Sequence, residues 1–144
     1  IGDVIELVDS KTLANEVVDL SANKMKESFF IMFMNQSCDE CKRGATELAK
    51  LGKLTQDQPK IARADCTFDK EACDIFVNHI DASNGTYPFL MMATPQRIHI
   101  YDGPINAQKI FDDFLSDEKY LKFEIHGGKG QSTAKVIESG LKYI

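Results

Sequence analysis

The sequence lacks a long apolar run and a cluster of basic residues. No apolar run in its 144 residues approaches the roughly 18 residues of a membrane-spanning helix, and no signal-peptide pattern opens it. The formal net charge is −5, and this balance without a basic cluster argues against nucleic-acid binding. Because the chain starts at Ile1 and not at methionine, we expect a processed or excised form of a longer protein.

Two ligand-binding patterns are missing as well. The glycine-rich residues 127–132 lack the G-x-x-x-x-G-K-[ST] spacing of a phosphate-binding loop and have no buried strand before them, so they predict a linker. His79, His99 and His126 fit no metal-ligand spacing, and we interpret them as ordinary structural or surface residues. The remaining composition, 43% hydrophobic and 27% charged, is that of one globular domain.

The most informative stretch is an apolar run that leads into a Cys-x-x-Cys pair. Residues 29–34 are apolar without interruption and rich in phenylalanine, which predicts a strand buried on both faces of a sheet. Cys38 and Cys41 follow at the turn into a predicted helix that extends to about residue 54. The unpaired N–H groups and the positive dipole end of that helix would stabilise a thiolate on Cys38.

Further periodic segments predict an α/β domain. We expect strands over residues 3–8, 29–34 and 61–66, a hairpin of residues 89–92 and 97–101, and helices over residues 10–18, 41–54, 70–80 and 133–144. Residues 21–28 predict a polar loop, and a further helix after residue 104 has Ile110, Phe111, Phe114 and Leu115 on its core face. A parallel strand pair crossed by a helix, then a hairpin and a final helix, predicts a mixed central β-sheet flanked by helices.

The four cysteines form two close pairs along the chain, Cys38 with Cys41 and Cys66 with Cys73. Such pairs are typical of an oxidising compartment or of a redox protein, whereas metal binding is the more common role in a cytosolic chain. A zinc site of all four cysteines is disfavoured because the six-residue gap of the second pair is wrong for a zinc knuckle. A fixed disulfide or half of a metal site is the alternative for the first pair, but its place after a buried strand favours a redox-active pair.

Five separated segments resemble a known family. They are residues 3–7, 38–43 (CDECKR), 64–67 (ADCT), 86–88 (TYP) and 101–104 (YDGP). In this order and spacing they are similar to a thioredoxin-fold domain of the protein disulfide isomerase group. The resemblance implies a thioredoxin-like domain over residues 1–120 and a C-terminal extension or linker over residues 121–144.

The resemblance also assigns roles at the active-site turn. Cys38 would be the attacking thiol, and Cys41 the resolving thiol that displaces a mixed disulfide. Tyr87 and Pro88 would form a cis-proline turn facing the two cysteines. That turn exposes the backbone of Tyr87 for pairing with an extended segment of a client protein.

Other implications of the resemblance concern the second cysteine pair and the cellular setting. Cys66 and Cys73 would form a structural disulfide, and no metal or organic cofactor is implied. The partners would be client proteins with cysteines or disulfides, in the endoplasmic reticulum lumen or another secretory compartment. Residues 102–119 resemble the lumenal domain of thioredoxin-related transmembrane proteins, so a membrane anchor beyond Ile144 is one expectation.

The sequence departs from the family around Cys38. Met32 stands where the family has a buried acid that relays protons to the resolving cysteine, and Ile105 stands where some members have arginine. Ser37 replaces the usual tryptophan. Asp39 and Glu40 place two negative charges between the cysteines, which disfavours the thiolate. We therefore expect a raised pKa of Cys38, a more stable disulfide and a slower enzyme than a typical isomerase.

Two functions fit these observations. The first is a thiol–disulfide oxidoreductase that forms a mixed disulfide on Cys38, which Cys41 resolves. The second is a thioredoxin-fold structural or client-binding module with little catalytic activity, such as an accessory subunit of a membrane-associated assembly. The intact cysteine pair favours the enzyme, and the departures from the family favour the binding module.

Overall fold

The computed structural model describes residues 3–7, 18–19, 24–25, 28–67, 73, 87–94 and 97–126. Its centre is a six-stranded sheet of β1 (Val4–Leu7), β4 (Phe29–Met34), β5 (Lys60–Asp65), β6 (Phe89–Ala93), β7 (Ile98–Tyr101) and β8 (Glu124–His126). The strand order is β1-β5-β4-β6-β7-β8. Strands β1 and β4 run parallel to β5, and β6, β7 and β8 continue the sheet in antiparallel pairs. The predicted mixed sheet is confirmed.

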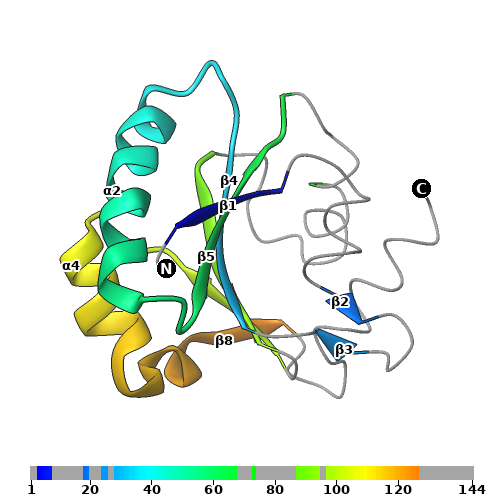
Figure 1. Cartoon of the computed structure of the whole chain (residues 1–144), viewed down its shortest axis with the longest axis vertical. Coiled ribbons are helices and arrows are strands. Elements are labelled where there is room, and N and C mark those ends of the chain that lie inside the picture. Colours follow the sequence, from blue (N-terminus) through cyan, green and yellow to red (C-terminus); the bar gives the residue numbers. More distant parts are fainter. Residues whose placement is uncertain are drawn as a thin grey trace.

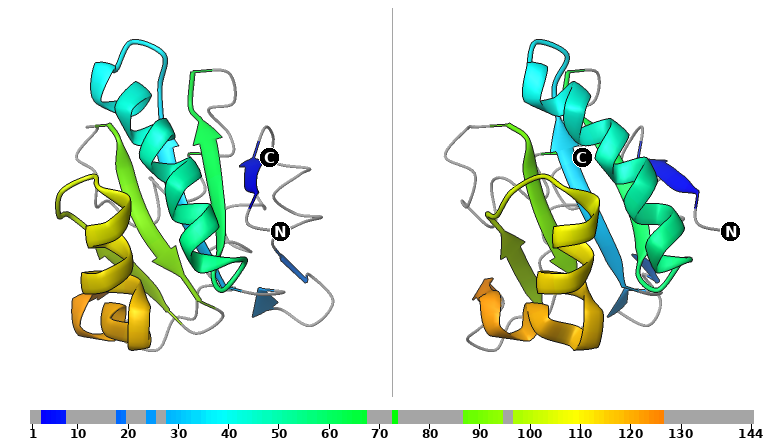
Figure 2. Two further views of the ribbon diagram at one scale, coloured as in Figure 1. Left: turned by 60° about the vertical axis from the view of Figure 1, so that its left-hand side comes forward. Right: turned by 90° about the vertical axis from the view of Figure 1, so that its left-hand side faces the viewer.

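Helical segments cover one face of this sheet. The main helix α2 (Asp39–Thr55) connects β4 to β5, and the short helix α4 (Ala107–Ile110) follows β7. A π-helical turn, η2 (Phe111–Leu115), and a 3₁₀ segment, η3 (Ser116–Phe123), continue from α4 to β8. Figure 2 shows α2 and α4 side by side in front of the same face. No helix among these residues is both long and apolar enough to cross a membrane.

Strand β4 lies in the middle of the sheet, between β5 and β6 (Figure 1). Phe30 and Met32 pack toward α2 and α4, whereas Phe29, Ile31 and Phe33 pack into a second core on the opposite face. All five side chains are buried. This double burial explains why the sequence of β4 is continuously apolar instead of alternating, and it fixes the position of the turn that carries Cys38.

The structure corrects several sequence predictions near the edges of the domain. Residues 10–17 lie outside the described residues, but Val18, predicted to end a helix, belongs to strand β2 (Val18–Asp19). Strand β3 (Lys24–Met25), within the predicted polar loop, pairs with β2. A β-branched valine suits such pairing, and its helical spacing was misleading because partners across a sheet are not visible along the chain.

The C-terminal part differs as well. The charged sequence after Leu115 gave no strand signal, yet β8 pairs with β7 and adds a sixth strand to the sheet. The boundary at residue 120 stays a prediction, and so does the helix over residues 133–144, which lies outside the described residues. Of the predicted helix over residues 70–80, only Cys73 is described, and it is helical.

One carboxylate joins the two helices, and it makes stability depend on pH. Oε1 of Glu47 accepts a hydrogen bond from the backbone N–H of Ala107 at 3.0 Å, and Oε2 accepts one from Lys50 Nζ at 2.9 Å. The bond from Ala107, followed by the one from Lys50, lowers the pKa of Glu47 below its usual 4.5. The stability that this ionised group contributes is present above pH 4.5 and is lost as the pH falls through the lowered pKa.

We therefore expect Glu47→Gln to lower the free energy of unfolding at pH 7 by about 1 kcal/mol, since it removes a charged acceptor of two hydrogen bonds. The deficit should shrink as the pH falls below 4.5. Urea unfolding at pH 7 and pH 3 measures it, with the exposed Glu40→Gln as the matched control. A deficit that is the same at both pH values would contradict the role of ionisation.

Candidate active site

The first cysteine pair lies where β4 gives way to α2. Cys38 is the N-cap residue of α2, with extended backbone angles of φ −112° and ψ 109°, and Cys41 lies in the first turn of the helix. The two residues form a disulfide. The sulfur of Cys38 also accepts a hydrogen bond from the backbone N–H of Cys41 at 3.0 Å. In the reduced protein, the same N–H and the helix dipole would stabilise a thiolate on Cys38.

The two cysteines differ in their access to solvent. Cys41 is completely buried, whereas Cys38 is partly exposed. A disulfide of an incoming protein can therefore reach the Cys38 sulfur but not the Cys41 sulfur. The arrangement gives the two cysteines the unequal exposure that an attacking and a resolving thiol require.

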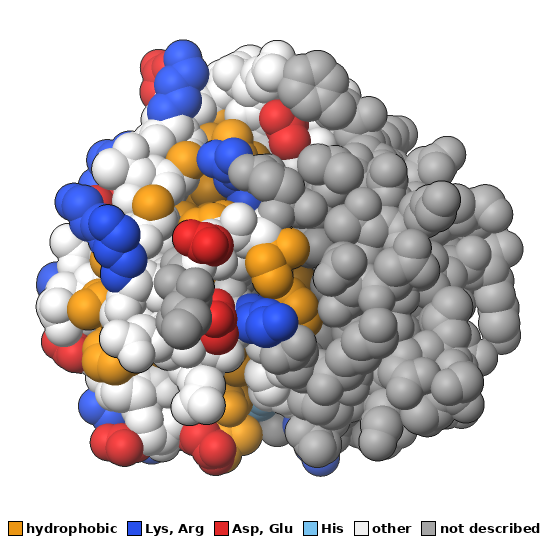
Figure 3. Space-filling view, viewed as in Figure 1, with side chains coloured by type: hydrophobic (Ala, Val, Ile, Leu, Met, Phe, Trp, Pro, Cys, Tyr) orange, Lys and Arg blue, Asp and Glu red, His pale blue; other side chains and the backbone are white. Residues whose placement is uncertain are grey.

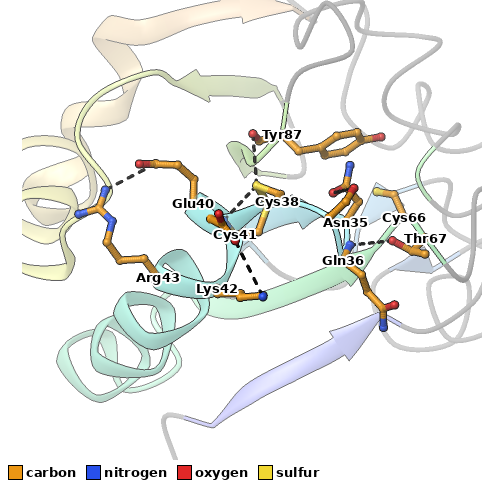
Figure 4. Close-up of a disulfide and its surroundings, with 12 residues drawn as sticks. Asn35, Gln36, Cys38, Glu40, Cys41, Lys42, Arg43, Cys66, Thr67 and Tyr87 are labelled. Carbon is orange, nitrogen blue, oxygen red and sulfur yellow. Dashed lines mark hydrogen bonds and ion pairs between the residues drawn. A yellow bond between two sulfur atoms is a disulfide. The ribbon is translucent and has the colours of Figure 1, made fainter.

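Tyr87 and Pro88 face this disulfide. Their peptide bond is cis, as the resemblance implied, and β6 begins directly afterwards at Phe89. The carbonyl oxygen of Tyr87 lies 3.5 Å from the Cys38 sulfur (Figure 4). A reduced Cys38 could donate its S–H to this carbonyl. The structure thus brings Cys38, Cys41 and the backbone of Tyr87 together.

The second cysteine pair lies beside the same turn. Cys66 and Cys73 form a disulfide, and Cys66 follows the last residue of β5. Its backbone N–H donates a hydrogen bond to the carbonyl of Met34 at 2.7 Å. Within the described residues, no group of three or more His, Cys, Asp or Glu side chains is placed to hold a metal ion.

The floor beneath the active site is apolar. Met32 is completely buried, and its Sδ would lie only 2.9 Å from a Cβ built on Gly44, one helical turn beyond Cys41. The side chain of Ile105 borders the same point, with Cγ2 at 3.6 Å. Among the residues whose side-chain burial the structure describes, the buried polar residues are Thr55, Thr94 and His99, and none of them has a carboxyl group.

The two acidic residues between the cysteines point into solvent. The side chain of Asp39 is fully exposed and that of Glu40 is 62% exposed. Their carboxylates lie 3.9 Å from Lys42 Nζ and 3.5 Å from Arg43 Nη2. Exposed charges with nearby counter-charges act weakly at a distance. The cost to a Cys38 thiolate is therefore smaller than the sequence alone suggested.

Opposite charges also alternate beyond these pairs. Figure 3 shows basic and acidic side chains interspersed over the described part of one face of the molecule. Such mixing produces no strong field of one sign over this surface. Charge alone does not select a strongly acidic or strongly basic partner for this face.

A groove of about 370 Å³ runs from Pro88 past the turn between β7 and α4. Its far wall is Tyr101, whose hydroxyl donates a hydrogen bond to the carbonyl of Pro104. Burial, together with the carboxylates of Asp113 and Asp102, raises the pKa of Tyr101 to about 12, so the phenol stays protonated as a donor. A Cβ on Gly103 would lie 2.7 Å from this hydroxyl, which explains the glycine in the turn.

Sequence reasoning missed the contacts that hold the active-site loop from outside. The backbone N–H of Gln36 donates to Oγ1 of Thr67 at 2.8 Å, although 31 positions separate the two residues. Thr67 was named only as part of the family resemblance. No local pattern identifies this bond, because its donor is a backbone group that every residue except proline has.

Comparisons with known proteins agree at the level of the fold. No protein-family model and no curated protein sequence matches the chain. Among solved structures, the J-Trx1 fragment of ERdj5 matches with a TM-score of 0.57 and 18% identity, over 74% of this chain and 47% of that one. The first thioredoxin domain of mouse protein disulfide-isomerase A4 matches with a TM-score of 0.55 and 22% identity, over 76% and 71%.

A third match has the same character. The Trx4 domain of ERdj5 gives a TM-score of 0.56 and 18% identity, over 75% of this chain and 89% of that domain. This chain spans about half the length of the J-Trx1 fragment, since it covers 47% of that chain. Identities this low concern the fold alone. The mixed sheet, the covering helices and these matches together establish that the chain has the thioredoxin fold.

Proposed function

We propose that this protein is a thiol–disulfide oxidoreductase that acts on cysteines of client proteins. The observation that carries the proposal is the position of the Cys38 sulfur. It is partly exposed, receives a hydrogen bond from a helix N-terminus, and is bonded to a buried second cysteine. A reversible two-cysteine couple needs these three properties together.

In the reducing direction, the Cys38 thiolate attacks one sulfur of a client disulfide. The client S–S bond breaks, a mixed disulfide forms on Cys38, and the departing client thiolate takes up a proton. The Cys41 thiolate then attacks the Cys38 sulfur and releases the second client thiolate. Two electrons pass from the enzyme to the client, and the enzyme finishes with its Cys38–Cys41 disulfide. Oxidation of a client dithiol is the same sequence reversed.

The cis-proline turn would hold the client during this exchange. The Tyr87 carbonyl lies 3.5 Å from the Cys38 sulfur, close enough for a client backbone N–H beside the reacting cysteine to bond to it. An extended client segment would then pair with the backbone before β6, in the manner of an added strand. Such pairing recognises the client main chain and leaves side-chain selection to the groove along Tyr101.

A secretory compartment, the endoplasmic reticulum lumen in particular, is the setting that we propose. Support comes from the two disulfides, since such bonds persist in oxidising compartments, and from the fold shared with a domain of protein disulfide-isomerase A4. The exchange needs no metal or organic cofactor. A membrane anchor outside this segment stays part of the proposal.

A second function is favoured by one observation, the apolar floor of Met32, Gly44 and Ile105. Because none of these three residues can take the proton of Cys41, resolution of a mixed disulfide would be slow. The protein would then act as a thioredoxin-fold binding module that captures clients with little turnover. An accessory subunit of a membrane-associated assembly fits that behaviour.

Reduction of insulin disulfides by the wild type and by Cys38→Ser separates the two functions. We expect the wild type to reduce insulin well above the background of the thiol reductant and Cys38→Ser to match that background. Ser37→Ala is the control, since Ser37 is exposed and adjacent to Cys38 but has no part in the exchange. Equal background rates for wild type and Cys38→Ser would exclude the oxidoreductase in favour of the binding module.

A further inference from the structure

The loop before Cys38 is held by the turn that follows β5. Gln36 donates its backbone N–H to Oγ1 of Thr67 at 2.8 Å. The backbone N–H of Thr67 in turn donates to Oδ1 of Asp65 at 2.9 Å, which fixes the position of Thr67. Cys66 lies between Asp65 and Thr67 in the sequence. Its backbone N–H donates a hydrogen bond to the carbonyl of Met34, the residue before Asn35. The loop is therefore connected to the β5 turn on both sides of Asn35.

The turn after β5 is itself fastened to the core by a covalent bond. Cys66 is joined to Cys73, whose side chain is only 1% exposed and belongs to the core cluster that includes Phe33 and Phe89. Tyr87, whose carbonyl faces Cys38, packs against the same cluster, as does Cys66. The loop of Cys38 and the cis-proline turn thus share one support, to which Cys73 is bonded.

We propose that the Cys66–Cys73 disulfide and Thr67 form a positioning bracket for Cys38 that sets the stability of the Cys38–Cys41 disulfide. We define this bracket as Asp65, Cys66, Thr67 and Cys73. It restricts the loop two residues before Cys38, so the Cys38 sulfur stays within bonding distance of Cys41. A freer loop lowers the effective concentration of one thiol at the other and so favours the dithiol.

The inference rests on the proposed function only for its biological meaning. If Cys38 exchanges disulfides with clients, the oxidation state of the second pair adjusts how strongly the first pair oxidises them. The bracket acts through position, because none of its side chains needs to touch a client. Its test can therefore use glutathione alone, and a failure of client reduction would leave it unaffected.

The first experiment is Thr67→Val, which keeps the shape of the side chain and removes the hydroxyl acceptor. The wild type and the variant are equilibrated with reduced and oxidised glutathione, and the Cys38–Cys41 pair is quantified by alkylation and peptide mass mapping. We expect the equilibrium constant for forming this disulfide to fall by about two- to fivefold. About fivefold is the limit that applies when the lost hydrogen bond stabilises the disulfide form alone. Thr67→Ser, which restores an acceptor, should stay within twofold of the wild type.

Ser116→Ala is the matched control. It also removes one hydrogen bond from a side chain to the backbone, the one to the carbonyl of Asp112 at 3.1 Å, at the start of η3. It should leave the constant unchanged. Constants that agree within twofold for wild type, Thr67→Val and Thr67→Ser would overturn the inference, and so would an equal fall in both Thr67 variants.

The second experiment removes the covalent part of the bracket with Cys66→Ala and Cys73→Ala together. Circular dichroism and urea unfolding establish whether the double variant is folded under the conditions of the equilibrium. The constant should then fall at least as far as in Thr67→Val. An unchanged constant in a folded double variant would overturn the role of the second disulfide, and if the variant is unfolded, Thr67→Val decides alone.

Discussion

Replacing Cys41 with alanine should convert a transient mixed disulfide into a stable one. In the wild type, the Cys41 sulfur is bonded to the Cys38 sulfur, and the two Cα atoms are 5.2 Å apart. No other thiol among residues 1–144 is available for resolution, because Cys66 and Cys73 are bonded to each other. Without Cys41, a client attached to Cys38 leaves only by reaction with an external thiol.

We expect Cys41→Ala to accumulate a client-linked species that survives on non-reducing gels, at a level at least tenfold above that of the wild type. Denatured ribonuclease with its disulfides scrambled serves as the client. Cys38→Ala is the control, since it keeps a single but buried cysteine at this turn, and it should accumulate none. Equal trapping by both variants would contradict the assignment of Cys38 as the attacking thiol.

Replacing Met32 with glutamate should make resolution faster and the protein less stable. Met32 is completely buried against Gly44, one helical turn beyond Cys41. A carboxylate there could accept the proton of the Cys41 thiol, and general-base help of this kind typically contributes on the order of 10²-fold or more. We expect the single-turnover rate of mixed-disulfide resolution to rise at least tenfold.

The loss of folding stability caused by Met32→Glu should depend on pH. Burial raises the pKa of the introduced carboxyl group. Below about pH 4 both folded and unfolded chains carry the proton. As the pH rises, the introduced carboxyl group loses its proton first in the unfolded chain. The free energy of unfolding therefore falls until the pH reaches the raised pKa of this group in the folded protein. We expect a loss of about 2–4 kcal/mol at pH 7.

Met32→Gln distinguishes proton transfer from polarity. It has the shape of glutamate and cannot take up the proton, so it should lower stability by an amount that is independent of pH. Its resolution rate should equal that of the wild type. A rate as high in Met32→Gln as in Met32→Glu would contradict proton transfer, and an unchanged rate in a folded Met32→Glu would show that the apolar floor does not limit resolution.

The elements predicted best from the sequence are those that are buried on both faces or that carry a local sequence pattern. Strand β4 was predicted at its observed bounds because both of its faces are covered, which makes its apolar run continuous. Helix α2 was predicted within two residues at its start, since the cysteine pair marks the turn into it and one face is apolar. The cis bond at Tyr87 and Pro88 came from the family resemblance alone, because local sequence does not determine it.

The remaining features depend on partners far apart in the chain. Strand β8 is short and charged, and only its pairing with β7 makes it a strand. The bond between Gln36 and Thr67 uses a backbone donor, so composition gives no sign of it. The side chains of Asp39 and Glu40 point into solvent and pair with Lys42 and Arg43. The sequence prediction of a raised Cys38 pKa counted the two acidic charges but not these basic partners.

The proposed function requires that the Cys38 sulfur is the atom that exchanges disulfides with other proteins. Its most direct test is peptide mass mapping of the complex that Cys41→Ala forms with scrambled ribonuclease. We expect a client cysteine linked to the peptide that contains Cys38, with Cys66 still linked to Cys73. A client linked to Cys66 or Cys73, or no linked client from a folded protein, would contradict it.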